Sequence, residues 1–206
     1  MNIDEVMRSA PVIPVLVLDG SIDPVALAET LVEAGLPVIE VTLRTPSALP
    51  AMKAMAAVEG SIVGAGTVLN ERMLREAIDS GAKFIVSPGL TERLGKAALA
   101  SGVPFLPGVA NAGDIMRGLD LGLSRFKFFP AEASGGLPAL KALAAPFGAV
   151  RFCPTGGIRE ETAPKWLAHP SVLCVGGSWL VQPGETDLTA IGERARRAAE
   201  LRADDE

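Results

Sequence analysis

Residues 12–21 read VIPVLVLDGS, an apolar run that ends in the turn Leu18-Asp19-Gly20-Ser21. A short run rich in Val, Ile and Leu predicts a strand that is covered on both faces, as in a parallel sheet. Such a sheet can be an open, doubly wound sheet or a closed barrel. The open sheet that binds dinucleotides carries GxGxxG after its first strand. The turn at 18–21 lacks that pattern, and this favours the barrel.

Similar apolar runs alternate with Ala- and Leu-rich helical windows along the whole chain. The predicted strands are 12–18, 38–43, 62–68, 84–87, 104–109, 126–129, 150–153 and 172–176. The predicted helices are 24–34, 48–58, 71–80, 92–100, 112–121, 137–145, 161–168 and 187–202, after a short helix at 1–10. Strands joined through helices run parallel, and eight such units leave no linker between domains. The sequence therefore predicts an α/β fold, a single (β/α)₈ TIM barrel over residues 1–206 with a short N-terminal helix.

The composition limits the class of partner. The chain has 206 residues, of which 49% are hydrophobic and 21% charged, so it can bury a large core. Its formal net charge is -5, whereas nucleic-acid-binding domains normally present a basic face. We therefore expect no nucleic-acid partner. An anionic small molecule remains compatible, because a few local donors can bind it inside an acidic protein.

The cysteines, the histidine and the N-terminus indicate the compartment and the absence of a metal. Cys153 and Cys174 have no CxxC spacing, which predicts buried free thiols in a reducing cytoplasm. The start of the chain lacks a basic signal-peptide region, and no apolar run approaches the roughly 20 residues of a membrane span. His169 is the only histidine and lies at a predicted helix end. We expect a cytoplasmic protein with no membrane partner, no metal and no cofactor.

One lysine lies inside an aromatic run. Residues 125–132 read RFKFFPAE and place Lys127 between two phenylalanines. A buried ammonium must be paired with an anion or give up its proton. A desolvated lysine amine is also the nucleophile that forms a Schiff base with a ketone. The competing interpretation is structural, with the lysine reaching solvent at a sheet edge or neutralised by a carboxylate.

A carboxylate lies on the inner face of the second predicted strand. Glu40, Thr42 and Arg44 are two residues apart and therefore share one face of the strand. In a barrel, inward-facing side chains at the carboxyl ends of the strands carry the chemistry. We expect Glu40 and Lys127 to meet in one polar cavity, with Glu40 as the acid/base beside the lysine. A purely structural ion pair is the alternative, although such pairs rarely add stability over apolar packing.

Glycines lie at the ends of several predicted strands. Residues 64–68 read GAGTV, which allows close approach of a ligand and places the Thr67 hydroxyl at the rim. Gly156-Gly157 and Gly176-Gly177 follow the last two strands. In many barrels the loops after these two strands bind a phosphate through backbone N–H groups. The paired glycines therefore predict a phosphate site.

Five motifs occur in order: EVTLRT at 40–45, GAGTV at 64–68, KFFPAE at 127–132, CPTGG at 153–157 and GGSW at 176–179. Together they resemble the bacterial 2-keto-3-deoxy-6-phosphogluconate (KDPG) aldolases, which are also described as 4-hydroxy-2-oxoglutarate (KHG) aldolases. The resemblance extends over about residues 11–181. It implies a lyase of the class I, metal-free type on a barrel, usually a homotrimer, in the cytoplasmic Entner–Doudoroff pathway.

The resemblance also implies the reaction and the residues that perform it. KDPG would be split reversibly into pyruvate and D-glyceraldehyde 3-phosphate, and 4-hydroxy-2-oxoglutarate into pyruvate and glyoxylate. Lys127 would form the Schiff base, and Glu40 would be the acid/base. The substrate would be bound by Arg44 and Thr67 at its carboxylate, Thr155 at its hydroxyl end, and Gly156, Gly157, Gly177 and Ser178 at its phosphate.

Three other interpretations remain open from the sequence. The chain could be a related aldolase for another 2-keto-3-deoxy sugar acid. It could be a barrel isomerase or epimerase that shares the phosphate site but forms no imine. A non-catalytic sugar-phosphate sensor is the third, although binding alone does not call for a nucleophile beside a carboxylate.

Overall fold

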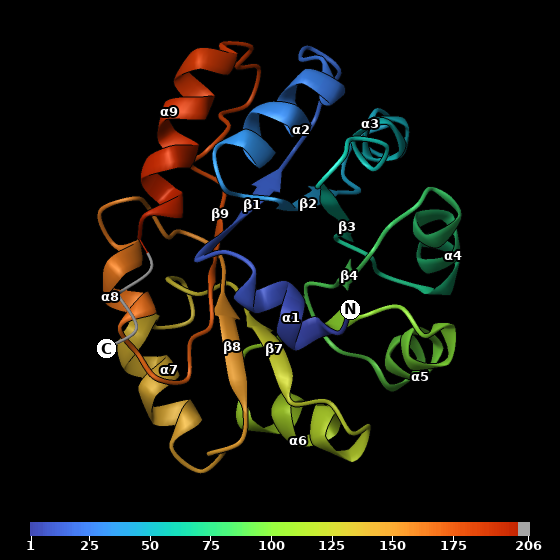
Figure 1. Ribbon diagram of the computed structural model, residues 1–206. Coiled ribbons are helices and arrows are strands. Elements are labelled where there is room, and N and C mark those ends of the chain that lie inside the picture. Colours follow the sequence, from blue (N-terminus) through green and yellow to red (C-terminus); the bar gives the residue numbers. More distant parts are fainter. Residues whose placement is uncertain (202–206) are drawn as a thin grey trace.

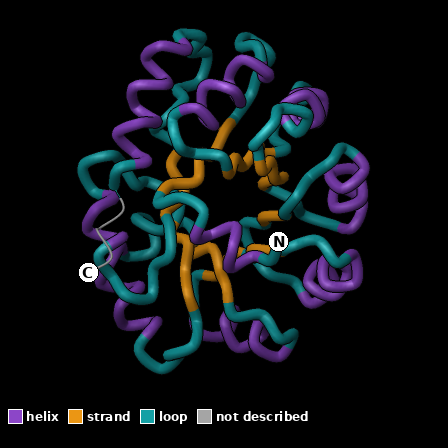
Figure 2. Tube along the Cα trace, viewed as in Figure 1, coloured by secondary structure: helices purple, strands orange, loops and turns teal. Residues whose placement is uncertain are grey.

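The structure is a computed structural model and describes residues 1–201. Strands lie at the centre and helices surround them (Figures 1 and 2). The strands are β1 (Val12–Leu16), β2 (Val38–Thr42), β3 (Ile62–Gly66), β4 (Ile85–Val86), β5 (Phe105–Leu106), β6 (Gly108–Val109), β7 (Arg125–Phe128), β8 (Arg151–Pro154) and β9 (Val175–Gly177). The helices are α1 (Ile3–Arg8), α2 (Pro24–Glu33), α3 (Ala48–Met55), α4 (Glu71–Asp79), α5 (Glu92–Ser101), α6 (Ala112–Asp120), α7 (Gly136–Ala144), α8 (Ala163–Leu167) and α9 (Leu188–Ala199).

The strands form two curled parallel ladders. A six-stranded sheet has the order β5-β4-β3-β2-β1-β9, and a three-stranded sheet has the order β6-β7-β8. Glu40 of β2 is the register partner of Gly64 in β3, and Lys127 of β7 is the partner of Gly108 in β6. The predicted α/β class and the parallel direction of the strands are thus confirmed.

Several strands are shorter than the sequence predicts. The predicted strand at 104–109 is divided at Pro107 into β5 and β6, because proline has no N–H to donate to a ladder. The predicted strand at 62–68 ends at Gly66, because Thr67 has a φ of +60° and leaves the extended conformation. The last helix ends at Ala199 rather than at the predicted 202, and residues 202–206 of the predicted domain lie outside the described residues.

Helix α1 covers one end of the strands. In Figure 1 it lies near the centre of the molecule, across the ends of the strands. Its Val6 and Met7 are fully buried and belong to a cluster of apolar side chains with Ile13, Phe84 and Leu106. Burial of an apolar side chain of this size contributes about 1.5–3 kcal/mol. This apolar layer closes the amino ends of the strands and leaves the polar side chains of β2 and β7 toward the carboxyl ends.

A carboxylate fastens α1 to β7. Asp4 accepts hydrogen bonds from Arg8 and from Arg125 at the start of β7. Burial acts to raise the pKa of Asp4, but the hydrogen bonds and charges of the two arginines outweigh it and lower the pKa below its usual value. The folded state therefore favours the ionised form of this side chain.

We expect the contribution of the Asp4 hydrogen bonds to stability to decrease in acid. A carboxyl whose pKa is lowered in the folded state stabilises that state. The stabilisation is fully present above the unfolded pKa of about 3.9, and it is lost as the pH falls through the folded pKa. Asp4→Asn should cost about 1 kcal/mol of unfolding free energy at pH 7, and the difference from wild type should shrink toward pH 3. Urea unfolding at both pH values measures it, with Glu29→Gln on the exposed face of α2 as control. An equal cost at both pH values would contradict the ionic account.

Candidate active site

Lys127 and Glu40 form a buried ion pair. Lys127 Nζ lies 2.9 Å from Glu40 Oε1 and 3.2 Å from Oε2. The exposed fraction is 6% for Lys127 and 3% for Glu40, so both charges are removed from bulk water. The alternation along β2 and β7 turns both side chains to the same interior. The structure thus brings together the two residues that the sequence predicts to meet.

An aromatic ring lies beside the amine. The centroid of the Phe129 ring is 5.4 Å from Lys127 Nζ, within the range at which a ring face attracts a cation. Sequence reasoning identified the aromatic run but did not assign Phe129 to the site. The KFFP motif, in which two phenylalanines follow Lys127, indicated that an aromatic ring would lie near the amine. Which of its phenylalanines contacts the amine depends on the turn after β7, which the strand pattern does not predict.

Gly66 makes room for the carboxylate. A Cβ built on Gly66 would lie 2.2 Å from Glu40 Oε1 and 2.7 Å from Glu40 Cγ. Real Cβ atoms do not approach other atoms so closely, so any side chain here would displace Glu40. The second glycine of the GAG motif is therefore required by the ion pair rather than by its own backbone conformation.

Arg44 and Thr67 lie together at the rim of this site. Arg44 Nε donates a hydrogen bond to Thr67 Oγ1 at 3.2 Å. Among residues 1–201 the Arg44 guanidinium has no carboxylate partner, so its charge is available to an anionic ligand. Thr67 has a left-handed φ of +60°, an unusual conformation for a β-branched residue. Thr42 plays a different part, because its hydroxyl donates to the Leu16 carbonyl at 2.8 Å and joins β2 to β1.

The residues predicted to contact the hydroxyl end and the phosphate of the substrate come from two adjacent turns. Thr155 is 5% exposed and is bridged to Gly176. Gly156 and Gly157 follow it with left-handed φ values of +103° and +79°. Gly177 ends β9, and the next residue, Ser178, is exposed. A Cβ built on Gly176 would lie 2.3 Å from Thr155 Oγ1, so this glycine lets the two turns meet.

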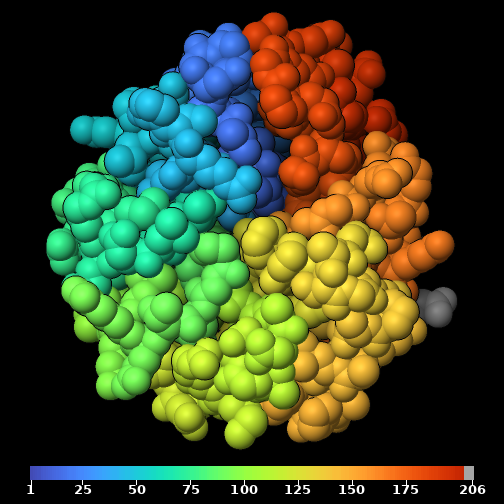
Figure 3. Space-filling model, turned by 180° about the vertical axis from the view of Figure 1, so that it is seen from behind, coloured from blue at the N-terminus to red at the C-terminus, as the bar shows by residue number. Residues whose placement is uncertain are grey.

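The Gly156-Gly157 turn also lies close to the ion pair. A Cβ built on Gly156 would lie 3.4 Å from the Phe129 ring, whose centroid is 5.4 Å from Lys127 Nζ. The Phe129 ring is therefore close to both the amine and the glycine turn. Figure 3 shows the face opposite to that of Figure 1, on which the yellow β7–α7 segment borders the orange segment that follows β8.

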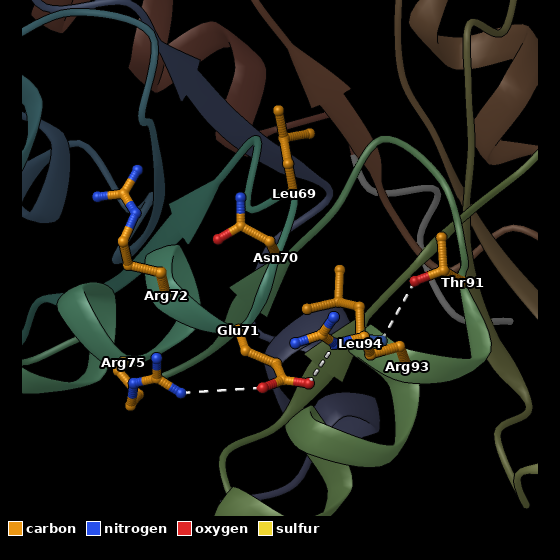
Figure 4. Close-up of a pocket in the computed structure, with 8 residues that line it drawn as sticks. All are labelled: Leu69, Asn70, Glu71, Arg72, Arg75, Thr91, Arg93 and Leu94. Carbon is orange, nitrogen blue, oxygen red and sulfur yellow. Dashed lines mark hydrogen bonds and ion pairs between the residues drawn. The ribbon is translucent and has the colours of Figure 1, made fainter.

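A separate cavity of about 370 Å³ lies between the N-terminal ends of α4 and α5. Figure 4 shows Glu71 at its centre, with an ion pair to Arg93 at 2.7 Å and a longer one to Arg75 at 3.9 Å. The hydrogen bond and the charge of Arg93 lower the pKa of Glu71, despite a smaller opposing effect of burial. None of the predicted site residues lines this cavity. Its arginines pair with carboxylates, so it is distinct from the Lys127–Glu40 site.

The structure also places the cysteines and the histidine. Both cysteines are buried and unbridged, as predicted. His169 accepts a hydrogen bond from the Ser171 backbone N–H at 3.2 Å, and burial lowers its pKa with a smaller effect of Lys141. In residues 1–201, no group of three His, Cys, Asp or Glu side chains is placed to hold a metal ion. Within the same range, every helix is too short or too polar to cross a membrane.

Comparison with known proteins identifies the family. The chain matches the family model described as "Aldolase: KDPG and KHG aldolase" over residues 3–193. It is 60% identical to the 2-dehydro-3-deoxy-phosphogluconate aldolase of Zymomonas mobilis, over 96% of this chain and 95% of that protein.

Solved structures agree with this match. The 2-keto-3-deoxy-6-phospho-gluconate aldolase of Zymomonas mobilis superposes with a TM-score of 0.97 at 58% identity, over 99% of both chains. The KDPG aldolase of Legionella pneumophila, solved with pyruvate captured at low pH as a covalent carbinolamine intermediate, has a TM-score of 0.94 at 40% identity, over 97% of this chain and 99% of that one. With its buried lysine–carboxylate pair, this chain belongs to the KDPG and KHG aldolase family.

Proposed function

We propose that this protein is a class I aldolase that reversibly cleaves 2-dehydro-3-deoxy-6-phosphogluconate to pyruvate and D-glyceraldehyde 3-phosphate. The observation that carries the proposal is the buried contact of 2.9 Å between Lys127 Nζ and Glu40 Oε1. A buried ion pair rarely adds stability over apolar packing, so a chemical role accounts for this pair better than a structural one. The family of the chain supports the reaction, and the carbinolamine captured in the Legionella pneumophila relative supports a covalent route.

The ion pair supplies the nucleophile and the acid/base that imine chemistry needs. Transfer of a proton from Lys127 to Glu40 gives a neutral amine and a protonated acid. The amine attacks the C2 ketone of the substrate and forms a C–N bond, and Glu40 protonates the resulting hydroxyl so that it leaves as water. The product of this step is an iminium on Lys127, with Glu40 again a carboxylate.

The iminium then accepts the electron pair of the breaking bond. Glu40 takes the proton of the C4 hydroxyl, directly or through a water, and the C3–C4 bond breaks as the aldehyde forms. The electron pair becomes the C2–C3 double bond of an enamine. Protonation of C3 and addition of water to the iminium release pyruvate and restore the amine. Water and protons balance over the cycle without any further reactant.

The other predicted residues would orient the substrate. The guanidinium of Arg44, hydrogen-bonded to Thr67 and without a carboxylate partner among residues 1–201, is suited to bind the keto-acid carboxylate and hold C2 over the lysine. Thr155 would contact the hydroxyl end. Backbone N–H groups near Gly156, Gly157 and Gly177, with the Ser178 hydroxyl, would bind the phosphate.

The same site would accept 4-hydroxy-2-oxoglutarate and release pyruvate and glyoxylate. The pyruvate half of the two substrates is the same, so Lys127, Glu40 and Arg44 would act alike on both. The family's description as KDPG and KHG aldolase supports this second activity. The difference between the substrates lies at the phosphate end.

We also propose that the two sheets close into the eight-strand (β/α)₈ barrel predicted from the sequence. Two observations support closure: β5 and β6 are separated only by Pro107, and a bridge joins Thr155 after β8 to Gly176 of β9. The family resemblance supports a cytoplasmic homotrimer in the Entner–Doudoroff pathway. Sedimentation equilibrium of the purified protein tests the trimer, and a monomeric mass would contradict it.

Pyruvate release tests the proposed reaction. The purified protein is incubated with 2-dehydro-3-deoxy-6-phosphogluconate, and pyruvate is measured through lactate dehydrogenase and the oxidation of NADH. We expect pyruvate and glyceraldehyde 3-phosphate in equal amounts. An isomeric sugar acid without pyruvate would indicate the isomerase alternative, and binding without any product would indicate a sensor.

Gly66→Ala should impair this reaction through Glu40. The new methyl group would lie 2.2 Å from Glu40 Oε1 and would push the carboxylate out of its present position beside Lys127. A displacement of about 1 Å at a reacting group can cost about 100-fold in rate, so we expect kcat to fall by about that factor. Gly148→Ala is the matched control, because a Cβ there meets nothing within 4 Å. Equal turnover in the two variants would contradict the role of Gly66.

A further inference from the structure

The Gly156-Gly157 turn rests on the residues that follow β7. The N–H of Glu132 donates to the carbonyl of Gly156 at 3.1 Å, and the N–H of Ala131 donates to that of Thr155 at 2.8 Å. A Cβ built on Gly157 would lie 2.8 Å from Glu132 Cβ and 2.9 Å from Glu132 Cγ. The stem of Glu132 therefore lies directly against Gly157.

The carboxylate of Glu132 binds α8. We call the two contacts of Glu132, its stem against Gly157 and its carboxylate to Trp166, the clamp. Trp166 Nε1 donates to Glu132 Oε1 at 3.1 Å, and Trp166 is 2% exposed. Its ring also packs on Phe128, the neighbour of Lys127, with centroids 6.3 Å apart. The segment from Gly156 to Trp166 is thus held at both ends by one residue: its start packs on the stem of Glu132 and its end binds the carboxylate.

The contact between Glu132 and Trp166 lies beside an open side of the segment. A cavity of about 410 Å³ borders Glu132, Trp166 and the first turn of α7. Between the two ends of the segment, Ile158 and Ala163 are buried and Glu160 pairs with Arg197 at 2.6 Å, so the glycine turn at its start is the part that depends on Glu132. Glycine has the greatest backbone freedom of any residue type. An unrestrained turn at Gly156 and Gly157 would lose that freedom when it binds an anion, and this loss of entropy would weaken binding. The negative charge of Glu132 would itself repel a phosphate, so a direct ligand role does not explain its presence.

We propose that Glu132 is a positioning residue that, through its hydrogen bond with Trp166, fixes the Gly156-Gly157 turn and so sets the affinity for the phosphorylated substrate. This inference rests on the proposed function and on the assignment of the turn to the substrate phosphate. Glu132 touches no reacting atom in this account. Its loss should therefore affect the phosphorylated substrate and spare 4-hydroxy-2-oxoglutarate, which has no phosphate.

Steady-state kinetics on the two substrates test the proposal. Trp166→Phe keeps the ring and removes the donor, and Glu132→Ala removes the acceptor and the stem. In both variants we expect KM for the phosphorylated substrate to rise about 10-fold or more, the effect of one lost hydrogen bond to a charged group, with kcat within about 2-fold. The double variant should be no worse than Glu132→Ala, because the two residues act through one bond.

Two further variants separate positioning from charge and from packing. Glu132→Gln keeps an acceptor oxygen and removes the charge, so its KM for the phosphorylated substrate should equal or fall below that of wild type. Glu161→Ala removes an exposed carboxylate from the same segment and should leave KM unchanged. The KM for 4-hydroxy-2-oxoglutarate should stay at the wild-type value in all of these variants.

Three results would overturn the proposal. One is an unchanged KM for the phosphorylated substrate in both Glu132→Ala and Trp166→Phe. Another is an equal loss on both substrates, which would make the clamp a general stabilising contact. The third is a wild-type protein that cleaves neither substrate, which would remove the proposed function itself and is visible before any variant is made.

Discussion

Lys127→Ala is expected to lower cleavage of 2-dehydro-3-deoxy-6-phosphogluconate by at least about four orders of magnitude, because no other group in the site can form the imine. The measurement is pyruvate release under saturating substrate. The same variant should form no adduct with pyruvate under borohydride. Turnover near the wild-type rate would show that Lys127 has a structural role.

The same substitution should also destabilise the fold. It leaves Glu40, which is 3% exposed, without its partner, and a buried charge deprived of its partner typically costs about 3–5 kcal/mol. Urea unfolding of Lys127→Ala should show a loss of this size. The double variant Lys127→Met/Glu40→Gln removes both charges and should recover most of it while remaining inactive. This pair of variants separates loss of chemistry from loss of fold.

Glu40→Gln is expected to slow turnover by about 10²–10⁴-fold, the usual contribution of a positioned acid/base. The amide keeps the shape of the carboxylate but cannot take a proton from the C4 hydroxyl. The variant should remain folded, since Lys127 Nζ can still donate to the amide oxygen, but the buried ammonium loses its counter-charge, so urea unfolding should show a loss of up to about 3–5 kcal/mol. Glu33→Gln, an exposed carboxylate at the end of α2, is the control. Unchanged turnover in Glu40→Gln would make Glu40 a structural partner only.

The meeting of Glu40 and Lys127 could be predicted from the sequence because it follows from two regularities. Side chains two residues apart on a strand share a face, and inward faces of parallel strands converge. The alternation of strands and helices could be predicted because short apolar runs alternate with helical windows along the chain. The roles of the two residues in catalysis stay predictions until they are tested.

Other features depend on contacts that periodicity does not encode. The left-handed φ of Thr67, which ends β3 early, is not indicated by the strand pattern of the GAGTV motif. The need for glycine at 66 appears only when the position of the Glu40 carboxylate is known. The bond between Trp166 and Glu132 joins residues 34 positions apart, and neither residue belongs to a pattern that would pair them.

The central claim is that Lys127 forms an imine with the keto acid. Its most direct test is the intact mass of the protein after borohydride reduction with pyruvate, followed by peptide mapping, with a sample lacking pyruvate as control. We predict a single reduced pyruvyl adduct on the peptide that contains Lys127. A folded protein that carries no adduct at saturating pyruvate, or carries it on another lysine, would contradict the claim.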